Sequence, residues 1–174
     1  MGEPNSDPDS FLALFTDFEH TAYRLEVRTS YGVAGEDEPY QRFLAGDDPG
    51  VSWLQPWLDV MSEQTGQGKR VERVRVVDDP PSDYLRWELA NTPHNLKAGE
   101  DIRYLSREKA MELRLPQYDY WVFDSRLLVS LRFDKDDRFL GFESDDDAGA
   151  VLLHLQWRDA AWHHALTFEQ YING

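Results

Sequence analysis

The stretch that most constrains the fold is the segment 118–143, YDYWVFDSRLLVSLRFDKDDRFLGFE. Short runs of alternating apolar and polar residues are separated there by two turn-forming clusters, at 125–126 and 134–137. This pattern predicts three short strands joined in an antiparallel meander. From Asp146 or Asp147 a long helix is expected to follow and to end near Ala165, because acidic residues suit a helix start.

Upstream of the meander, the sequence predicts a strand, a helix and a second strand. The valine-rich segment 71–77 is typical of a central strand, and the Asp-Pro turn at 78–81 leads into a helix expected over 82–91. After a loop that contains Pro93, the segment 101–105 predicts the next strand. Because a right-handed crossover is the preferred connection, we expect these two strands to be parallel with the helix packed over them. The expected fold class is therefore α/β (α+β), with a mixed sheet flanked by helices.

Two segments alternate charged and apolar residues. Tyr23, Leu25 and Val27 alternate with arginine and glutamate in the segment 23–28, which predicts a half-buried strand. The basic run 69–75 alternates in the same way, and we interpret its charged residues as the solvated side of a strand. Further helices are expected from Asp9 or Ser10 to His20, over 38–44, from Ser52 to Gly66, and over 106–113.

Composition limits the class of function. The chain has 174 residues and a formal net charge of -15, which disfavours binding to nucleic acid or anionic membranes and favours basic partners. It has no cysteine, so disulfides and thiolate chemistry are excluded, and we expect a cytoplasmic protein. Residues 1–8 are predicted to be disordered and residues 9–174 to form a single globular domain, with no membrane span.

Three local signatures resemble a family of actinobacterial domains of unknown function that are usually encoded beside helix-turn-helix regulators. They are YRLE at 23–26, VRVV at 74–77 leading to DYLR at 83–86, and AGEDIR at 98–103. The resemblance covers most of the chain, from Phe11 to Tyr171. It implies a cytoplasmic regulatory protein, with a helix-turn-helix regulator as its partner.

The order of elements also looks like one half of a phospholipase-D-like domain. In the catalytic members of that superfamily a histidine attacks phosphorus, a lysine two residues later holds the phosphate, and an aspartate five residues further supports the site. In this chain Gln117 and Asp119 stand at the first two positions, and only Asp124 matches. The resemblance implies a phospholipase-D-like fold without the nucleophile or the phosphate clamp.

No catalytic or metal-binding motif is evident. The adjacent His163 and His164 lack the spacing of a zinc site on one helix. The acidic cluster of Glu143, Asp145, Asp146 and Asp147 is explained equally well by weak binding of a hard cation and by a capped helix start, and neither a metal nor a cofactor is expected. Trp53 and Trp57 lie one helical turn apart. They are interpreted either as core anchors or as a stacking platform for a planar ligand.

A ligand site is expected where the parallel strands end, because ligands of such sheets gather at the carboxyl ends of strands. Residues expected to line or border that edge are Asp83, Tyr84, Arg86, Arg103, Asp119 and Asp124. Arg103 is interpreted either as an internal salt-bridge partner or as a clamp for a carboxylate or phosphate.

Two functions of different classes follow from these patterns. The first is a non-catalytic regulatory protein that binds a transcriptional regulator or another protein partner, because a strong acidic field and many aromatic residues suit a protein interface. The alternative is a small-ligand sensor or hydrolase with its site at the strand ends. A closed pocket with converging arginine and aspartate groups favours the alternative, whereas an exposed tryptophan or tyrosine patch favours the interface.

Overall fold

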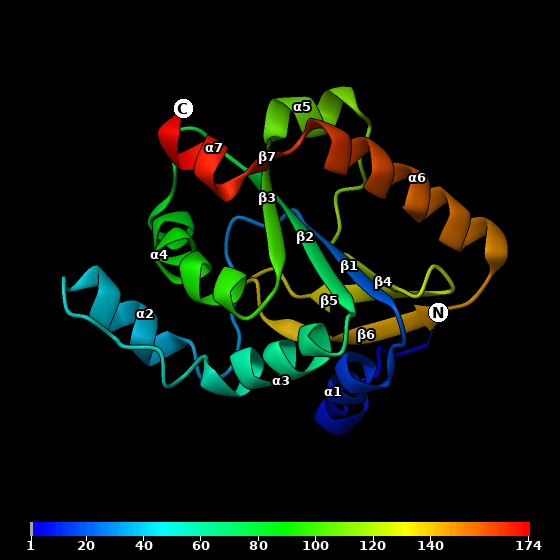
Figure 1. Ribbon diagram of the computed structural model, residues 1–174, viewed down its shortest axis with the longest axis horizontal. Coiled ribbons are helices and arrows are strands. Elements are labelled where there is room, and N and C mark those ends of the chain that lie inside the picture. The colour runs from blue at the N-terminus through cyan, green and yellow to red at the C-terminus, as the bar shows by residue number, and fades with distance from the viewer. Residues whose placement is uncertain (1) are drawn as a thin grey trace.

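A seven-stranded mixed sheet runs through the centre of the computed structural model, which describes residues 2–174 (Figure 1). The strand order is β6-β5-β4-β1-β2-β3-β7. The strands are β1 Thr21–Glu26, β2 Arg70–Val77, β3 Asp101–Ser106, β4 Tyr120–Phe123, β5 Leu127–Phe133, β6 Phe139–Asp145 and β7 Leu166–Thr167. The helices are α1 Pro8–Asp17, α2 Asp37–Leu44, α3 Gln55–Gly66, α4 Asp83–Lys97, α5 Arg107–Glu112, α6 Ala148–His164 and α7 Phe168–Asn173.

The topology confirms the expected fold class. Strands β1, β2 and β3 are parallel, and α4 forms the crossover between β2 and β3. Strands β4, β5 and β6 form the antiparallel meander, and β4 joins it to the parallel part by pairing with β1. The helix predicted to end near Ala165 is α6, which begins after the N-cap residue Asp147.

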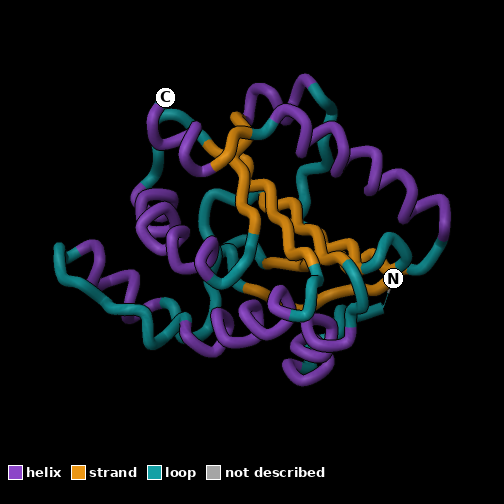
Figure 2. Tube along the Cα trace, in the orientation of Figure 1, coloured by secondary structure: helices purple, strands orange, loops and turns teal. Residues whose placement is uncertain are grey.

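Helices cover both faces of the sheet, as Figure 1 and Figure 2 show. On one face α5 and α6 pack over an apolar core that includes Tyr23, Leu25 and Val122. On the other face α1 and α3 pack over a second core that includes Phe15, Met61 and Trp121, while α4 lies beside it over β3. The two faces differ in chemistry, because successive residues of a strand point to opposite sides.

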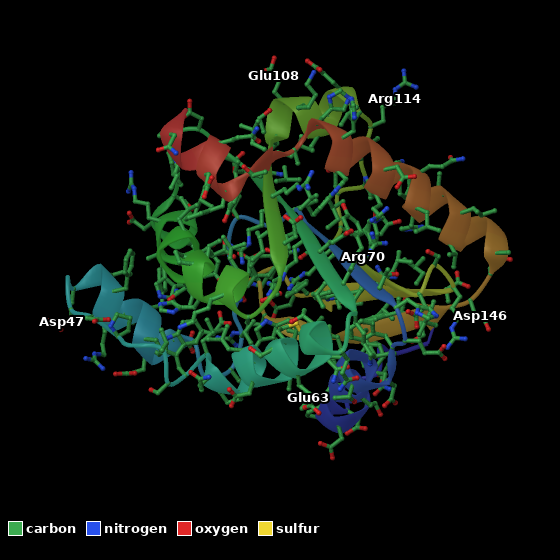
Figure 3. The ribbon with its side chains drawn as sticks, viewed as in Figure 1. Asp47, Glu63, Arg70, Glu108, Arg114 and Asp146 are labelled. Carbon is green, nitrogen blue, oxygen red and sulfur yellow. The ribbon has the colours of Figure 1, made fainter. Side chains whose placement is uncertain are left out.

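The main departure from the sequence-based expectation is on this second face. The charged residues of β1 and β2 were expected to face solvent, but Glu26, Arg73 and Arg75 lie on the face that α3 and α4 cover. Glu26, Arg73 and Arg75 are only 3%, 8% and 7% exposed. By contrast, the charged side chains labelled in Figure 3, which are Asp47, Glu63, Arg70, Glu108, Arg114 and Asp146, are exposed to solvent.

Helix α4 is longer than expected. The sequence predicted an end near Asn91 and a loop at Pro93, but the helix continues through Pro93 to Lys97. Side chains support the weakened turn, since Asn91 Nδ2 donates to the Trp87 carbonyl and Thr92 Oγ1 to the Glu88 carbonyl. The additional turn places Asn95 over the sheet.

Elements at both ends of the chain were also missed. Strand β7 pairs with β3, and α7 follows it with a capping box between Thr167 and Gln170, a signal that the sequence does contain. Residues 1–8 were predicted to be disordered, and two of them make contacts with the fold. Asn5 forms a bridge with Phe142, and Asp7 caps α1. Met1 lies outside the described residues.

No helix within residues 2–174 has the length and apolar character needed to cross a membrane.

The contact between α3 and the end of α4 yields a test of the fold. Gly99 has a φ of +95°, and a Cβ there would lie 2.2 Å from Thr65 Oγ1, which donates to the carbonyls of Met61 and Ala98. Gly35 has a similar φ of +90° but no heavy atom within 4 Å of the added Cβ. We expect Gly35→Ala to cost about 1 kcal/mol and Gly99→Ala at least about 2 kcal/mol more, measured by urea unfolding. Equal losses for the two variants would contradict this packing.

Candidate functional site

A group of charged side chains forms the floor of a pocket on the face that α3 and α4 cover. Arg24 and Glu26 come from β1, and Arg73 and Arg75 come from the adjacent strand β2. In each pair the two residues are two positions apart, so their side chains point to the same face of the sheet. The parallel register then places all four side chains together.

The Glu26 carboxylate lies at the centre of this group. Its Oε1 accepts from Arg73 Nη1 at 3.2 Å and its Oε2 accepts from Arg75 Nε at 3.0 Å, while Arg24 Nη1 lies 3.8 Å away. Burial raises the pKa of Glu26, but the attraction of Arg75, Arg24 and Arg73 outweighs it and lowers the pKa to about 2. Glu26 is therefore ionised at neutral pH.

Two further carboxylates complete the ion pairs of the floor. Arg73 Nε donates to Glu100 Oε1 at 2.8 Å, and Asn95 and Trp57 donate to Glu100 Oε2. Arg24 Nη2 donates to Asp119 Oδ2 at 3.0 Å. Each buried guanidinium thus has a carboxylate partner, as buried charges require.

Asp119 also fixes the chain segment that follows β1. Its carboxylate accepts from the Val27 backbone N–H at 2.9 Å and from the Tyr31 hydroxyl at 2.7 Å, in addition to Arg24. Burial raises its pKa, and Arg24 and these hydrogen bonds oppose the rise. Asp119 therefore holds Tyr31 beside the floor.

Aromatic side chains form the walls of the pocket, which has a volume of about 350 Å³. Trp53 stacks on Trp87 with ring centroids 4.9 Å apart, and the ring of Trp57 lies 5.3 Å from the Arg73 guanidinium carbon. The aromatic residues that line the pocket are Phe11, Tyr31, Trp53, Trp57, Tyr84, Trp87, Phe133 and Phe139. Residues 33–36 lie at the same pocket. Its size and mixed lining are typical of a small-molecule site.

Glu88 is the acidic side chain of this pocket that lacks close partners. Its side chain is 17% exposed, its Oε1 lies 3.8 Å from Arg75 Nε, and no side-chain hydrogen bond reaches it from residues 2–174. Burial raises its pKa to about 7; Glu26 adds to this rise, while Arg75, the strongest of the nearby cations, opposes it. Glu88 therefore titrates near neutral pH.

The structure brings only two of the six predicted site residues to this pocket. Tyr84 lines it and its hydroxyl donates to Glu36 at 3.3 Å, and Asp119 supports it through Arg24 and Tyr31. Asp83 and Arg86 form an exposed ion pair with each other on α4.

The remaining two predicted residues have structural contacts elsewhere. Arg103 points to the opposite face of the sheet, where it pairs with Asp101 at 3.3 Å and lies 3.8 Å from the centre of the Trp162 ring. Asp124 lies at the amino end of β1, where it accepts from the N–H groups of residues 19–21. These hydrogen bonds lower its pKa despite partial burial. Neither residue lies at the carboxyl edge where it was expected.

Comparison with solved structures identifies the class of fold. NucT from Helicobacter pylori aligns with a TM-score of 0.51 and 9% identity, over 91% of this chain and 89% of that chain. Nuc from Salmonella typhimurium, a phospholipase D family member, aligns with a TM-score of 0.52 and 10% identity, over 92% and 93%. The chain has a phospholipase-D-like fold.

The family is also defined. The chain belongs to the family described as "Domain of unknown function (DUF6879)", whose model matches residues 9–173. No curated protein matches the chain.

The central ion pairs yield a prediction about stability. Replacing Glu26 with glutamine leaves three buried arginines facing one fewer charge, and we expect a loss of about 3–5 kcal/mol in the free energy of unfolding. Glu19→Gln removes only exposed contacts with Arg126 and His20 and is expected to change stability by less than about 0.5 kcal/mol. Urea unfolding of both variants measures the difference. A Glu26→Gln variant as stable as the Glu19→Gln control would show that the network contributes nothing.

Glu88 yields a prediction about pH dependence. Its pKa is about 7 in the folded protein, against an ordinary value of 4.5, so its contribution to stability is present at low pH and is lost as pH rises through about 7. The loss amounts to at most about 3 kcal/mol. We expect unfolding measured from about pH 5 to about pH 8 to show this loss in the wild type and not in Glu88→Gln. Parallel pH profiles for the two proteins would contradict the assigned environment.

Proposed function

We propose that this domain binds a small molecule in the aromatic pocket and acts as a ligand sensor. The observation that carries the proposal is the pocket itself, which combines aromatic walls with a floor of paired charges and one carboxylate, Glu88, without a close partner. Such a combination of apolar contact area and a few oriented polar groups is what small-molecule sites use for affinity and specificity.

The distribution of aromatic residues supports a ligand site over a protein interface. Aromatic anchors of interfaces lie exposed in the free protein. Among the phenylalanine, tyrosine and tryptophan residues of 2–174, only Tyr118 is exposed. Trp53 and Trp57 both line the pocket. Of the two interpretations of this tryptophan pair, a platform for a planar ligand is the one that the proposal adopts.

The lining also supports binding rather than covalent catalysis. The described residues around the pocket include no histidine, cysteine, serine, threonine or lysine, so the nucleophiles left there are carboxylates and tyrosines. Gln117, at the position of the catalytic histidine of phospholipase-D-like enzymes, lies outside this pocket and lines a separate groove with Arg107 and Arg114.

A protein partner is a second proposal, favoured by one observation. Leu152 and Leu153 of α6 and Met111 of α5 are exposed apolar side chains on helices that cover the face opposite the pocket. A helix-turn-helix regulator encoded beside the gene is the partner that the family resemblance implies. A pull-down at low and moderate salt tests this, and the absence of a complex at both salt concentrations removes its support.

A fragment screen tests the proposed function. We expect planar fragments to raise the melting temperature of the protein and to shift the indole NMR signals of the pocket tryptophans. Trp53→Ala should reduce the affinity of such fragments at least about tenfold, because it removes one wall of the pocket.

The matched control is Trp157→Ala, on α6 and on the other face of the sheet. It should leave fragment affinity unchanged. A screen without hits, or hits whose binding both variants weaken equally, would remove the support for a ligand site at this pocket.

A further inference from the structure

We propose that the ligand of this pocket is a planar organic cation, such as an aryl amidine or guanidine, whose charged group donates hydrogen bonds to Glu88. This inference rests on the proposed function and adds the chemical class of the ligand. It follows from the charges, the hydrogen bonds and the aromatic rings at the pocket.

The charges on the floor balance before Glu88 is included. Arg24 pairs with Asp119, Arg73 with Glu100, and Arg75 with Glu26, which Arg73 also contacts. The positive charges are thus already neutralised, and an anionic ligand finds no free guanidinium. Glu88 is additional, and so is Glu36 at the Tyr84 hydroxyl. A cation supplies the charge that these two carboxyls lack.

The hydrogen bonds lead to the same class of ligand. Asn91 uses Nδ2 on the Trp87 carbonyl and Asn95 uses Nδ2 on Glu100, so the oxygen of each amide remains an acceptor without a described donor. Glu88 likewise accepts no side-chain hydrogen bond from residues 2–174. Arg24 Nε and Trp87 Nε1 are donors without a partner, but both atoms are fully covered and so cannot reach a ligand. The pocket therefore offers acceptors at Glu88, Asn91 and Asn95, and a ligand that carries donors satisfies them.

The aromatic walls suit a delocalised cation. Two guanidinium groups of the protein already lie against their rings, with Arg73 at 5.3 Å from the centre of Trp57 and Arg24 at 5.2 Å from the centre of Tyr31. Cations are attracted to such rings, and a planar group stacks on them as well. A volume of about 350 Å³ accommodates a scaffold of two fused rings.

Binding of a cation should be linked to the ionisation of Glu88. The groups that act on this carboxyl are Arg73 and Arg75 of β2, Arg24 and Glu26 of β1, Tyr84 of α4, Tyr104 of β3, and Tyr31 in the segment after β1. Burial raises its pKa to about 7, so part of the protein carries a proton there at neutral pH. A bound cation favours the ionised form and displaces that proton.

The test uses three ligands of one shape and different charge: 2-naphthamidine, 2-naphthamide and 2-naphthoate. Calorimetric titration of the full chain is expected to show binding of the amidine at least about tenfold tighter than that of the amide, and no binding of the naphthoate. The amidine affinity should rise about tenfold between about pH 6 and about pH 8, as Glu88 loses its proton.

Variants assign the effect to Glu88. Glu88→Gln should weaken amidine binding at least about tenfold, abolish its pH dependence and leave the amide unaffected. Glu38→Gln, an exposed change of equal charge on α2, should change none of these values. If Glu88→Gln does not fold, proton release by the wild type, measured in two buffers of different ionisation enthalpy, replaces it.

The outcomes separate this inference from the proposed function. Amide or naphthoate binding at least as tight as that of the amidine, and lost in Trp53→Ala, would overturn the cation while retaining the ligand site. Amidine binding that Glu88→Gln leaves unchanged, or that releases no proton, also overturns the inference. If none of the three binds at millimolar concentration, the inference fails, and the fragment screen decides on the ligand site.

Discussion

The hydrogen bonds of the Glu26 carboxylate with Arg73 and Arg75, beside Arg24 at 3.8 Å, are the interaction on which the rest of the structure depends. A charge in the middle of a sheet is costly unless it is paired, so Arg24, Arg73 and Arg75 each require carboxylate partners. Those partners come from distant parts of the chain, since Asp119 precedes β4 and Glu100 follows α4. The network thus joins the parallel strands to the meander and fixes the end of α4. This role accounts for the large destabilisation expected when Glu26 loses its charge.

The charged floor also explains why the pocket on this face of the sheet is bounded by rings and polar atoms. Opposite the pocket, apolar side chains from α5 and α6 pack directly on the strands. On the charged face, α3 and α4 meet the floor with tryptophan, asparagine and glutamate side chains, and the residual space of about 350 Å³ is bounded by rings and polar atoms. In this chain the phospholipase-D-like fold contains a buried charge network at the centre of the sheet. Asp119 is part of that network, whereas Gln117 lies outside the pocket.

Sequence reasoning predicted the elements better than the site. The meander and the crossover of α4 could be predicted because hydrophobic period and turn residues depend on neighbouring positions. The charged floor could not be predicted, because a sequence with charged residues at every second position has the same pattern whether those residues face solvent or buried partners. The partners of Arg24 and Arg73 lie 95 and 27 residues away. Glu88 gave no signal for the same reason. The environment of Glu88 is made mainly by residues of β1, β2 and β3. Pro93 wrongly predicted that α4 ends before Asn95.

The central claim is that the described residues leave Glu88 as the carboxyl without close partners beside an otherwise paired charge network. Carbon-detected NMR titration of the side-chain carboxyl groups, with glutamate labelled, tests it most directly. The account predicts that Glu88 titrates at about 7 and that Glu26 stays ionised until the pH falls to about 2. A Glu88 midpoint near the ordinary glutamate value of 4.5, or protonation of Glu26 in the same range, would contradict it.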